Sequence, residues 1–157
     1  MNYAVQITED LTVIGQVRVE QLHQAAEVGF RSVLNLRSPD ELGFWQDEGQ
    51  VAERLGLQYL NLPLKLELLD EVTVTEILGR LDHLPKPVLI HCAAGMRSTA
   101  IALLKAALNQ GLTPEQTIEK ARSLGFHYID CTMVHPQLRQ RFVDYINKYA
   151  QSMAIAA

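Results

Sequence analysis

Residues 87–99 read PVLIHCAAGMRST, and this stretch decides the fold. Its first five residues are mostly apolar and predict a short buried strand. A tight turn is expected at Gly95, because glycine accepts backbone angles that other residues resist. A helix is predicted from about Arg97 to Asn109. A strand that passes through a short loop into a helix directs backbone amides and the positive end of a helix dipole at one point, which favours an anion there.

Outside this stretch, short β-rich runs alternate with helical patterns. The alternation predicts a single α/β domain over residues 1–157, with a four- or five-stranded, largely parallel sheet between helices. The predicted strands are Leu11–Ile14, Ser32–Leu36, Leu57–Leu62 and Pro87–His91. Further helices are predicted over about 19–29, 46–55 and 136–151. Thr73 with Glu76 fits a capping box, in which a hydroxyl and a carboxylate satisfy the first amides of a helix. Thr113 with Gln116 fits the same signature.

Composition and charge narrow the class of protein. The chain has 157 residues, of which 48% are hydrophobic and 20% charged, as in ordinary globular domains. A net charge of -4 argues against nucleic acid or an anionic membrane as the main partner. The longest apolar run, Ala100–Leu108, is too short to span a bilayer, and we see no signal peptide. We therefore expect a cytoplasmic protein, of open oligomeric state, that needs no metal or organic cofactor.

The cysteines indicate a catalytic role for one of them and do not indicate a disulfide-stabilised fold. There are two, Cys92 and Cys131, which is too few for a disulfide framework, and no CxxC pair predicts zinc. Cys131 is interpreted as structural, and a resolving thiol is the alternative. A lone cysteine is usually just a small buried residue. Cys92 differs because a histidine, a glycine and an arginine surround it within seven positions of a strand-to-helix junction.

Each part of this loop has a chemical use. A helix N-terminus and a nearby cation favour the thiolate of Cys92, which is the nucleophilic form. Arg97 can return a planar fork that grips two oxygens of a phosphate-like group. Ser98 can donate a hydrogen bond to the sulfur when it acts as a leaving group. Residues of the loop and its flanks are predicted to bind the substrate: His91, Ala93, Ala94, Gly95, Met96 and Ser98.

The pattern H-C-x-x-G-x-R-S at positions 91–98 resembles the signature loop of protein tyrosine and dual-specificity phosphatases. The order of the predicted elements is similar to that of the compact dual-specificity phosphatase fold, which is phosphotyrosine protein phosphatase II-like. Segments 7–16 and 29–37 resemble one bacterial branch more closely, the DUF442 or beta-lactamase-hydrolase-like phosphatase domain family. The resemblance covers about residues 5–110. It implies a cysteine-dependent phosphatase that acts on a phosphorylated protein or a small phosphate ester.

The length of the loop keeps other functions open. The usual phosphatase loop has one residue more between Cys and Arg than the four found here. The DUF442 branch shares the shorter spacing, and so do rhodaneses, sulfurtransferases whose cysteine carries a persulfide. A shorter loop offers one amide fewer and a narrower ring, which suits a single sulfur atom. A sulfurtransferase and a module that binds a phosphorylated partner without turnover are therefore alternatives.

A phosphatase also needs an acid that protonates the leaving oxygen. Relatives place an aspartate on the loop after the strand that precedes the nucleophile strand, which here is the loop 64–71. Asp70 is the first candidate. The alternatives lie on the same loop or after the second long strand: Glu67, Glu71, Asp40 and Glu41.

Two further residues are predicted to support the site. Arg37 follows a strand that should end beside the nucleophile loop, because parallel sheets gather function at the carboxyl ends of their strands. It is expected to hold either the loop or the substrate. His91 is expected to orient the loop through backbone groups near Cys92, and not to act as a general base.

Overall fold

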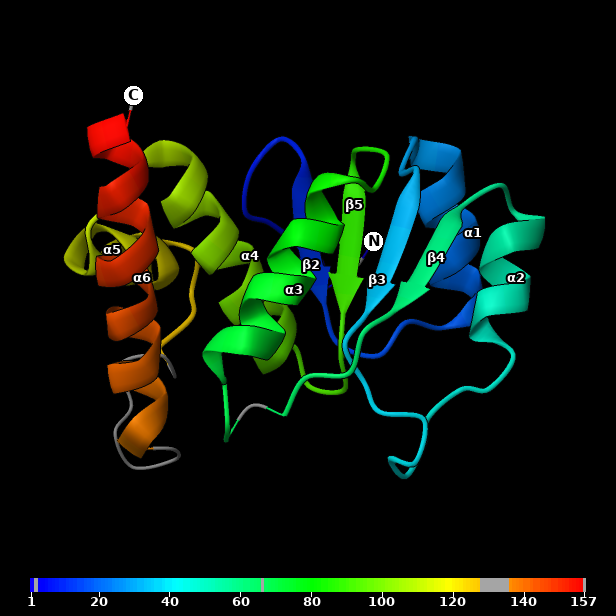
Figure 1. Ribbon diagram of the computed structural model, residues 1–157. Coiled ribbons are helices and arrows are strands. Elements are labelled where there is room, and N and C mark those ends of the chain that lie inside the picture. The colour runs from blue at the N-terminus through cyan, green and yellow to red at the C-terminus, as the bar shows by residue number, and fades with distance from the viewer. Residues whose placement is uncertain (2, 66, 128–135, 157) are drawn as a thin grey trace.

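A computed structural model describes residues 1, 3–65, 67–127 and 136–156 (Figure 1). One mixed sheet forms the centre. Its strands are β1 Val5–Gln6, β2 Leu11–Ile14, β3 Ser32–Asn35, β4 Gln58–Asn61 and β5 Val88–His91. They lie in the order β1-β2-β5-β3-β4, with β1 antiparallel to β2 and the other neighbours parallel. The predicted α/β fold with a mostly parallel sheet is therefore confirmed. The two-residue strand β1 was not predicted.

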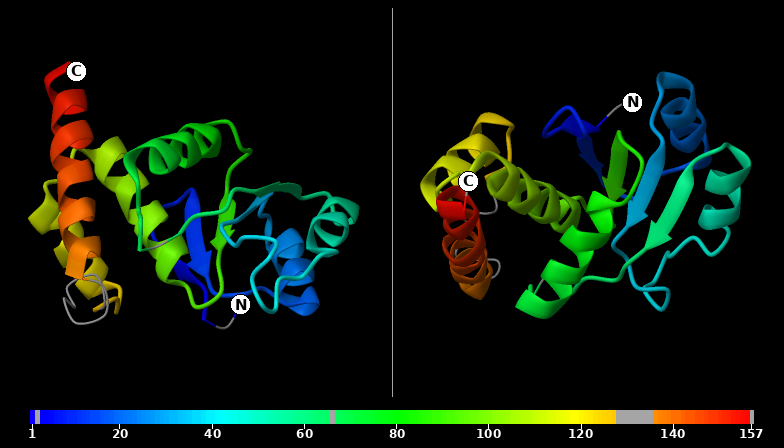
Figure 2. Two further views of the ribbon diagram at one scale, coloured as in Figure 1. Left: turned by 60° about the horizontal axis from the view of Figure 1, so that its bottom comes forward. Right: turned by 45° about the horizontal axis from the view of Figure 1, so that its top comes forward.

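Helices cover both faces of the sheet. They are α1 Val19–Val28, α2 Glu48–Arg54, α3 Glu71–Asp82, α4 Met96–Gln110, α5 Pro114–Ser123 and α6 Pro136–Ala156. Helices α1 and α2 lie on one face, and α3 and α4 lie on the other (Figure 2). Helices α5 and α6 pack on α4 at one end of the molecule, at the left of Figure 1. No helix among the described residues is long and apolar enough to cross a bilayer.

The layers follow from the side chains of the central strands. Successive side chains of a strand point to opposite faces of the sheet. Val33 and Leu89 are paired in register and join the core under α1 and α2. The next pair, Leu34 and Ile90, joins the larger core under the remaining helices. All four are fully buried. A strand that is buried on both faces must be apolar throughout, which is why the sequence of β5 could be recognised.

One helix start was predicted wrongly. Asp70, and not Thr73, is the N-cap of α3, and its carboxylate accepts the backbone N–H of Thr73 at 2.9 Å. The proposed capping box of Thr73 with Glu76 was therefore wrong, because an aspartate one turn earlier caps the helix first. The second capping box is confirmed. Thr113 Oγ1 accepts the N–H of Gln116 at 3.1 Å, and the Gln116 side chain accepts the N–H of Thr113 at 2.9 Å.

The parallel strands end at one edge of the sheet, the lower edge in Figure 1. The segments that follow β2, β3, β4 and β5 therefore meet there. This is where a parallel α/β sheet ordinarily places its functional groups.

Candidate active site

The nucleophile loop joins β5 to α4 at this edge. Cys92 directly follows β5 and is only 1% exposed. Its Sγ accepts a hydrogen bond from the backbone N–H of Gly95 at 3.1 Å. Gly95 is the N-cap of α4 and has φ 97°, a left-handed conformation that favours glycine. The sulfur is thus held at the N-terminus of a 15-residue helix, at the positive end of the helix dipole.

The segment after β2 supports the loop from a second side. The backbone N–H of Gln16 donates to the carbonyl oxygen of Ala93 at 2.9 Å. A Cβ at Gly15 would lie 2.8 Å from that same oxygen, so only glycine allows this approach of the two backbones. Ser98 Oγ lies 3.1 Å from the carbonyl oxygen of the last β2 residue and 3.6 Å from Cys92 Sγ. Ser98 therefore ties α4 to β2 and keeps a hydroxyl beside the sulfur.

His91 is fully buried, and both of its ring nitrogens have partners. Nδ1 lies 3.2 Å from the carbonyl oxygen of Cys92, as expected of a residue that orients the loop. Nε2 lies 2.6 Å from Oε2 of Glu48, a carboxylate that is also fully buried. Sequence reasoning missed Glu48. The signal that could have found it is helical spacing, since Glu48 lies four positions before Ala52, the other buried residue of α2.

Glu48 is the centre of a polar network whose members come from strands β3, β4 and β5 and from the segments that follow β2 and β3. Gln16 Nε2 donates to its Oε1 at 2.8 Å, and Asn35 Nδ2 donates to its Oε2 at 3.3 Å. Arg37 Nη1 donates to Oε1 of Gln16 at 2.8 Å. Asn35 also donates to the hydroxyl of Tyr59 at 2.9 Å. Burial raises the pKa of Tyr59, and the Glu48 carboxylate adds to the rise. No buried side-chain nitrogen or oxygen in the described part of the chain lacks a hydrogen-bond partner.

Arg37 organises the segment between β3 and α2. It is buried, with 5% exposure. Its guanidinium donates to the carbonyl oxygens of Leu42 at 2.6 Å and Gly43 at 3.1 Å, and Nε lies 2.9 Å from Glu41 Oε2. Through Gln16 it is also connected to the segment that supports the nucleophile loop. Of the two roles expected for Arg37, these contacts favour holding the loops over binding the substrate.

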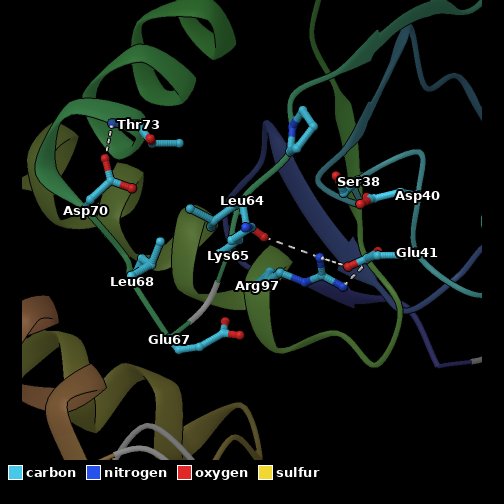
Figure 3. A pocket seen from close by; sticks show the side chains of 11 residues that line it. Ser38, Asp40, Glu41, Leu64, Lys65, Glu67, Leu68, Asp70, Thr73 and Arg97 are labelled. Atoms are coloured by element: carbon cyan, nitrogen blue, oxygen red, sulfur yellow. Dashed lines mark hydrogen bonds and ion pairs between the residues drawn. The ribbon is translucent and has the colours of Figure 1, made fainter.

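Arg97 points toward Glu41 (Figure 3). Nη1 lies 2.6 Å from Glu41 Oε1, and Nη2 lies 3.4 Å from Oε2. Nη1 also donates to the carbonyl oxygen of Leu64 at 3.3 Å. Burial alone would raise the pKa of Glu41, but the hydrogen bonds and charges of Arg97 and Arg37 outweigh it and hold that pKa below its ordinary value. The fork of Arg97 thus holds two oxygens of one anion, here a carboxylate of the protein itself.

Arg97 and Glu41 line an open cleft of about 750 Å³. Five of the predicted site residues lie on its wall: Asp40, Glu41, Glu67, Asp70 and Arg97. Pro63 and Leu68 supply apolar surface, and Lys65 supplies a second cation (Figure 3). Cys92 does not line this cleft. The structure therefore brings four of the five candidate acids and the arginine together, all but Glu71, with the buried sulfur held in the loop that precedes Arg97.

The candidate acids differ in what they already bind. Asp70 caps α3, and the backbone hydrogen bond from Thr73 is the main cause that lowers its pKa. Glu71 lies outside the cleft wall and pairs with Lys148 of α6 at 2.6 Å. Glu67 lines the cleft and has no hydrogen-bond or ion-pair partner among the described residues. Asp70 is already engaged as the cap of α3 and Glu67 is not, so these contacts favour Glu67 as the acid, and the roles of both residues stay predictions.

Two other sequence predictions concern Cys131 and metal binding. Cys131 lies in the segment 128–135, outside the described residues. Within the described ranges, no group of three or more His, Cys, Asp or Glu side chains is arranged to hold a metal ion.

Comparison with known proteins now assigns the chain to a family. Residues 4–111 match the family model described as "Beta-lactamase hydrolase-like protein, phosphatase-like domain". The chain belongs to this family. The match runs from β1 to the end of α4. It therefore includes the whole nucleophile loop and the residues Arg37, Glu41 and Glu48. The predicted family is confirmed.

Relatives and solved structures agree with this assignment. A Beta-lactamase hydrolase-like protein from Agrobacterium fabrum is 25% identical over 127 residues, which cover 78% of this chain and 29% of the relative. This chain thus matches less than a third of that protein's length. A DUF442 structure from Shewanella putrefaciens CN-32 has a TM-score of 0.78 at 24% identity, and covers 94% of this chain and 93% of its own. P. aeruginosa TpbA, solved in complex with pTyr, has a TM-score of 0.71 at 15% identity, with 98% and 89% covered. These likenesses confirm the dual-specificity phosphatase-like fold.

Proposed function

We propose that this protein hydrolyses phosphate monoesters through a cysteinyl-phosphate intermediate. The observation that carries the proposal is the loop itself: Cys92 Sγ is held at a helix N-terminus by the amide of Gly95, and Arg97 reaches from the same helix into the cleft. A thiolate nucleophile and a bidentate cation, joined by one short loop, are the parts that phosphoryl transfer from an ester to cysteine requires. Membership of a phosphatase-like family supports the same reaction class.

In the first step the Cys92 thiolate attacks phosphorus, and the bond between phosphorus and the ester oxygen breaks. The leaving oxygen takes a proton from a carboxylic acid of the cleft, for which Glu67 and Asp70 are the candidates. Arg97 exchanges the Glu41 carboxylate for two equatorial oxygens of the phosphoryl group. Preorganised donors of this kind usually supply the largest part of the rate enhancement.

In the second step a water molecule attacks the cysteinyl phosphate. The same carboxylate removes a proton from the water, and the bond between sulfur and phosphorus breaks to release inorganic phosphate. Ser98 Oγ, at 3.6 Å from Sγ, can donate its proton toward the departing thiolate. The sulfur then returns to the position in which it accepts the amide of Gly95. No step requires a metal or an organic cofactor.

The cleft supports a proposal for the substrate class. Its volume of about 750 Å³ and the apolar side chains of Pro63 and Leu68 suit the aromatic ring or alkyl part of an ester whose phosphate reaches Arg97. The complex of TpbA with pTyr supports phosphotyrosine as a first substrate to test, although this likeness rests on the fold. We propose a phosphorylated protein or a small phosphate ester as the natural substrate.

A second candidate function is sulfur transfer, and the short loop favours it. With four residues between Cys92 and Arg97, the ring of amides is small and suits one sulfur atom. The Cys92 thiolate would then attack the outer sulfur of thiosulfate, release sulfite and keep a persulfide. Cyanide would remove that sulfur as thiocyanate.

One experiment separates the two functions. The protein is exposed either to an aryl phosphate such as phosphotyrosine or to thiosulfate, and Cys92 is examined by mass spectrometry. A phosphate adduct, together with phosphate release that the Cys92→Ser variant lacks, is the expected result, because a hydroxyl is a far weaker nucleophile than a thiolate near neutral pH. Rapid sulfur transfer to cyanide, with phosphate release no greater than that of Cys92→Ser, would replace the first proposal by the second.

A further inference from the structure

The buried pair of Glu48 and His91 has no part in the reaction proposed above. Both side chains have an exposure of 0%. Burial of a carboxylate is unfavourable unless the carboxylate is paired and hydrogen-bonded. We propose that the two form an ion pair, an imidazolium with a carboxylate, in which Glu48 is a positioning residue that keeps positive charge beside Cys92.

The hydrogen bonds of His91 fix the number of its protons. Nδ1 faces the carbonyl oxygen of Cys92, which can only accept, so Nδ1 carries a proton. A neutral imidazole has a single N–H. If Nδ1 holds it, the 2.6 Å contact between Nε2 and Glu48 Oε2 needs a second proton. The pair therefore holds two protons. One lies on Nδ1, and the other lies between Nε2 and Glu48 Oε2.

The groups around Glu48 place that proton on the histidine. The amide oxygen of Gln16 accepts from Arg37, so its NH₂ group must face Glu48 and donate to Oε1. The amide oxygen of Asn35 accepts the backbone N–H of Arg37, so its NH₂ group donates to Oε2. A carboxylate that accepts several hydrogen bonds is favoured in its ionised form. With donors already facing both oxygens of Glu48, the proton of the short contact is placed on Nε2 of His91.

The orientation of the pair places its positive end against the backbone of Cys92. The Nδ1 side of the ring faces Cys92 and the Nε2 side faces Glu48, so the carboxylate lies beyond the ring. The other ionisable groups near the pair are Tyr59 on β4, which stays protonated because burial raises its pKa, and Arg37, which acts through Gln16. Both leave the charge of the pair unchanged near neutral pH. The imidazolium therefore favours the Cys92 thiolate.

The protonation state of His91 can be measured in the protein without substrate. This inference rests on the proposed role of Cys92 as nucleophile, but NMR of protein with isotope-labelled histidine needs no substrate. The His91 signals are assigned by their loss in His91→Asn. At neutral pH we expect both ring nitrogens of His91 to carry protons. In Glu48→Gln, whose amide can donate to Nε2, we expect only Nδ1 to remain protonated. A singly protonated His91 in the wild type would overturn the inference.

A second measurement follows the thiol. Glu48→Gln should lower the fraction of Cys92 present as thiolate at neutral pH by roughly twofold or more, because a neutral histidine no longer stabilises the anion. The fraction is measured from thiolate absorbance as the difference from Cys92→Ser, so that Cys131 cancels. Glu53→Gln, an exposed position on the same helix, is the matched control and should change nothing.

The outcomes are distinct. An unchanged thiolate fraction in folded Glu48→Gln contradicts the inference, and if that variant does not fold, the wild-type NMR result decides. A doubly protonated His91 in a protein that turns over neither phosphate esters nor thiosulfate would contradict the proposed function and leave the ion pair supported.

Discussion

Glu41 and Arg97 lie 56 positions apart in the chain, and their side chains meet at 2.6 Å in the wall of the cleft. Both oxygens of the carboxylate lie within reach of the guanidinium, at 2.6 Å and 3.4 Å from its terminal nitrogens. Arg37 holds the same carboxylate from the other side at 2.9 Å. In the proposed reaction the oxygens of a substrate must therefore replace those of Glu41, and the two anions compete for one arginine.

Removing the charge of Glu41 should strengthen anion binding. Glu41→Gln leaves the shape of the side chain but no longer pairs with Arg97. Its affinity for inorganic phosphate, measured by calorimetry, should rise by roughly threefold to tenfold, because a partly exposed ion pair contributes about 1 kcal/mol. Asp40→Asn, which neutralises the neighbouring exposed carboxylate of the same cleft, should change the affinity less. Weaker phosphate binding by Glu41→Gln would mean that Glu41 positions Arg97 for the substrate and does not compete with it.

The same pair should make stability depend on acidity. The two arginines hold the pKa of Glu41 below its ordinary value of 4.5, so the folded state binds this proton less readily than the unfolded state. A lowered pKa stabilises the fold fully above pH 4.5 and less as the pH falls through the folded-state value. The difference in free energy of unfolding between the wild type and Glu41→Gln should therefore be constant near neutral pH and shrink in acid. Denaturant unfolding at a series of pH values measures it, and a difference that grows in acid would contradict this account.

Arg97 should act through its geometry as well as its charge. Arg97→Lys keeps the positive charge, but a point charge cannot make two parallel hydrogen bonds to one phosphoryl group. We expect the catalytic rate on an aryl phosphate to fall by roughly tenfold or more. Phosphate affinity should fall less, because the charge remains. Equal rates for the two proteins, each corrected for the Cys92→Ser blank, would exclude bidentate binding by Arg97.

The fold and the loop could be predicted because their signals are local. The strand, the glycine and the helix start of residues 87–99 follow one another in the chain, and their order alone specifies the junction. The partner of His91 could not be predicted in this way. Glu48 lies 43 positions away and reaches His91 only because β5 is inserted between β2 and β3. Its sequence context resembles that of an ordinary solvated acid at a helix start.

The general acid was difficult to predict for a related reason. A carboxylate before a helix can cap it or serve the cleft, and its residue type is the same in both cases. Asp70 accepts the amide of Thr73 and caps α3. Only the three-dimensional contacts separate it from Glu67, which lines the same cleft without such a partner among the described residues.

Substitution of these two acids should separate their roles. Glu67→Gln should lower the catalytic rate by roughly tenfold or more while leaving stability unchanged, because it removes the proton donor and no contact of the fold. Asp70→Ala should destabilise the protein by about 1 kcal/mol through loss of the cap. Asp70→Asn, which still caps, should restore that stability. If Asp70→Asn proved folded and inactive while Glu67→Gln kept its rate, Asp70 would be the acid after all.

Gly15 should prove essential to the nucleophile loop although it lies on a different strand-to-helix connection. In Gly15→Ala the new Cβ would lie 2.8 Å from the carbonyl oxygen of Ala93, and a backbone atom cannot move aside without shifting the loop. The hydrogen bond from Gln16 to Ala93 would be strained at the same time. We expect the alkylation rate of Cys92 and the catalytic rate to fall together.

The control for Gly15→Ala is Gly79→Ala, in the middle of α3. A Cβ at Gly79 meets no atom within 4 Å, and alanine in a helix is more stable than glycine by roughly 0.5–1 kcal/mol. Gly79→Ala should therefore raise the free energy of unfolding and leave both rates unchanged. A Gly15→Ala protein with wild-type alkylation and turnover would mean that the backbone after β2 does not hold the loop in its reactive arrangement, and that the contact with Ala93 serves folding alone.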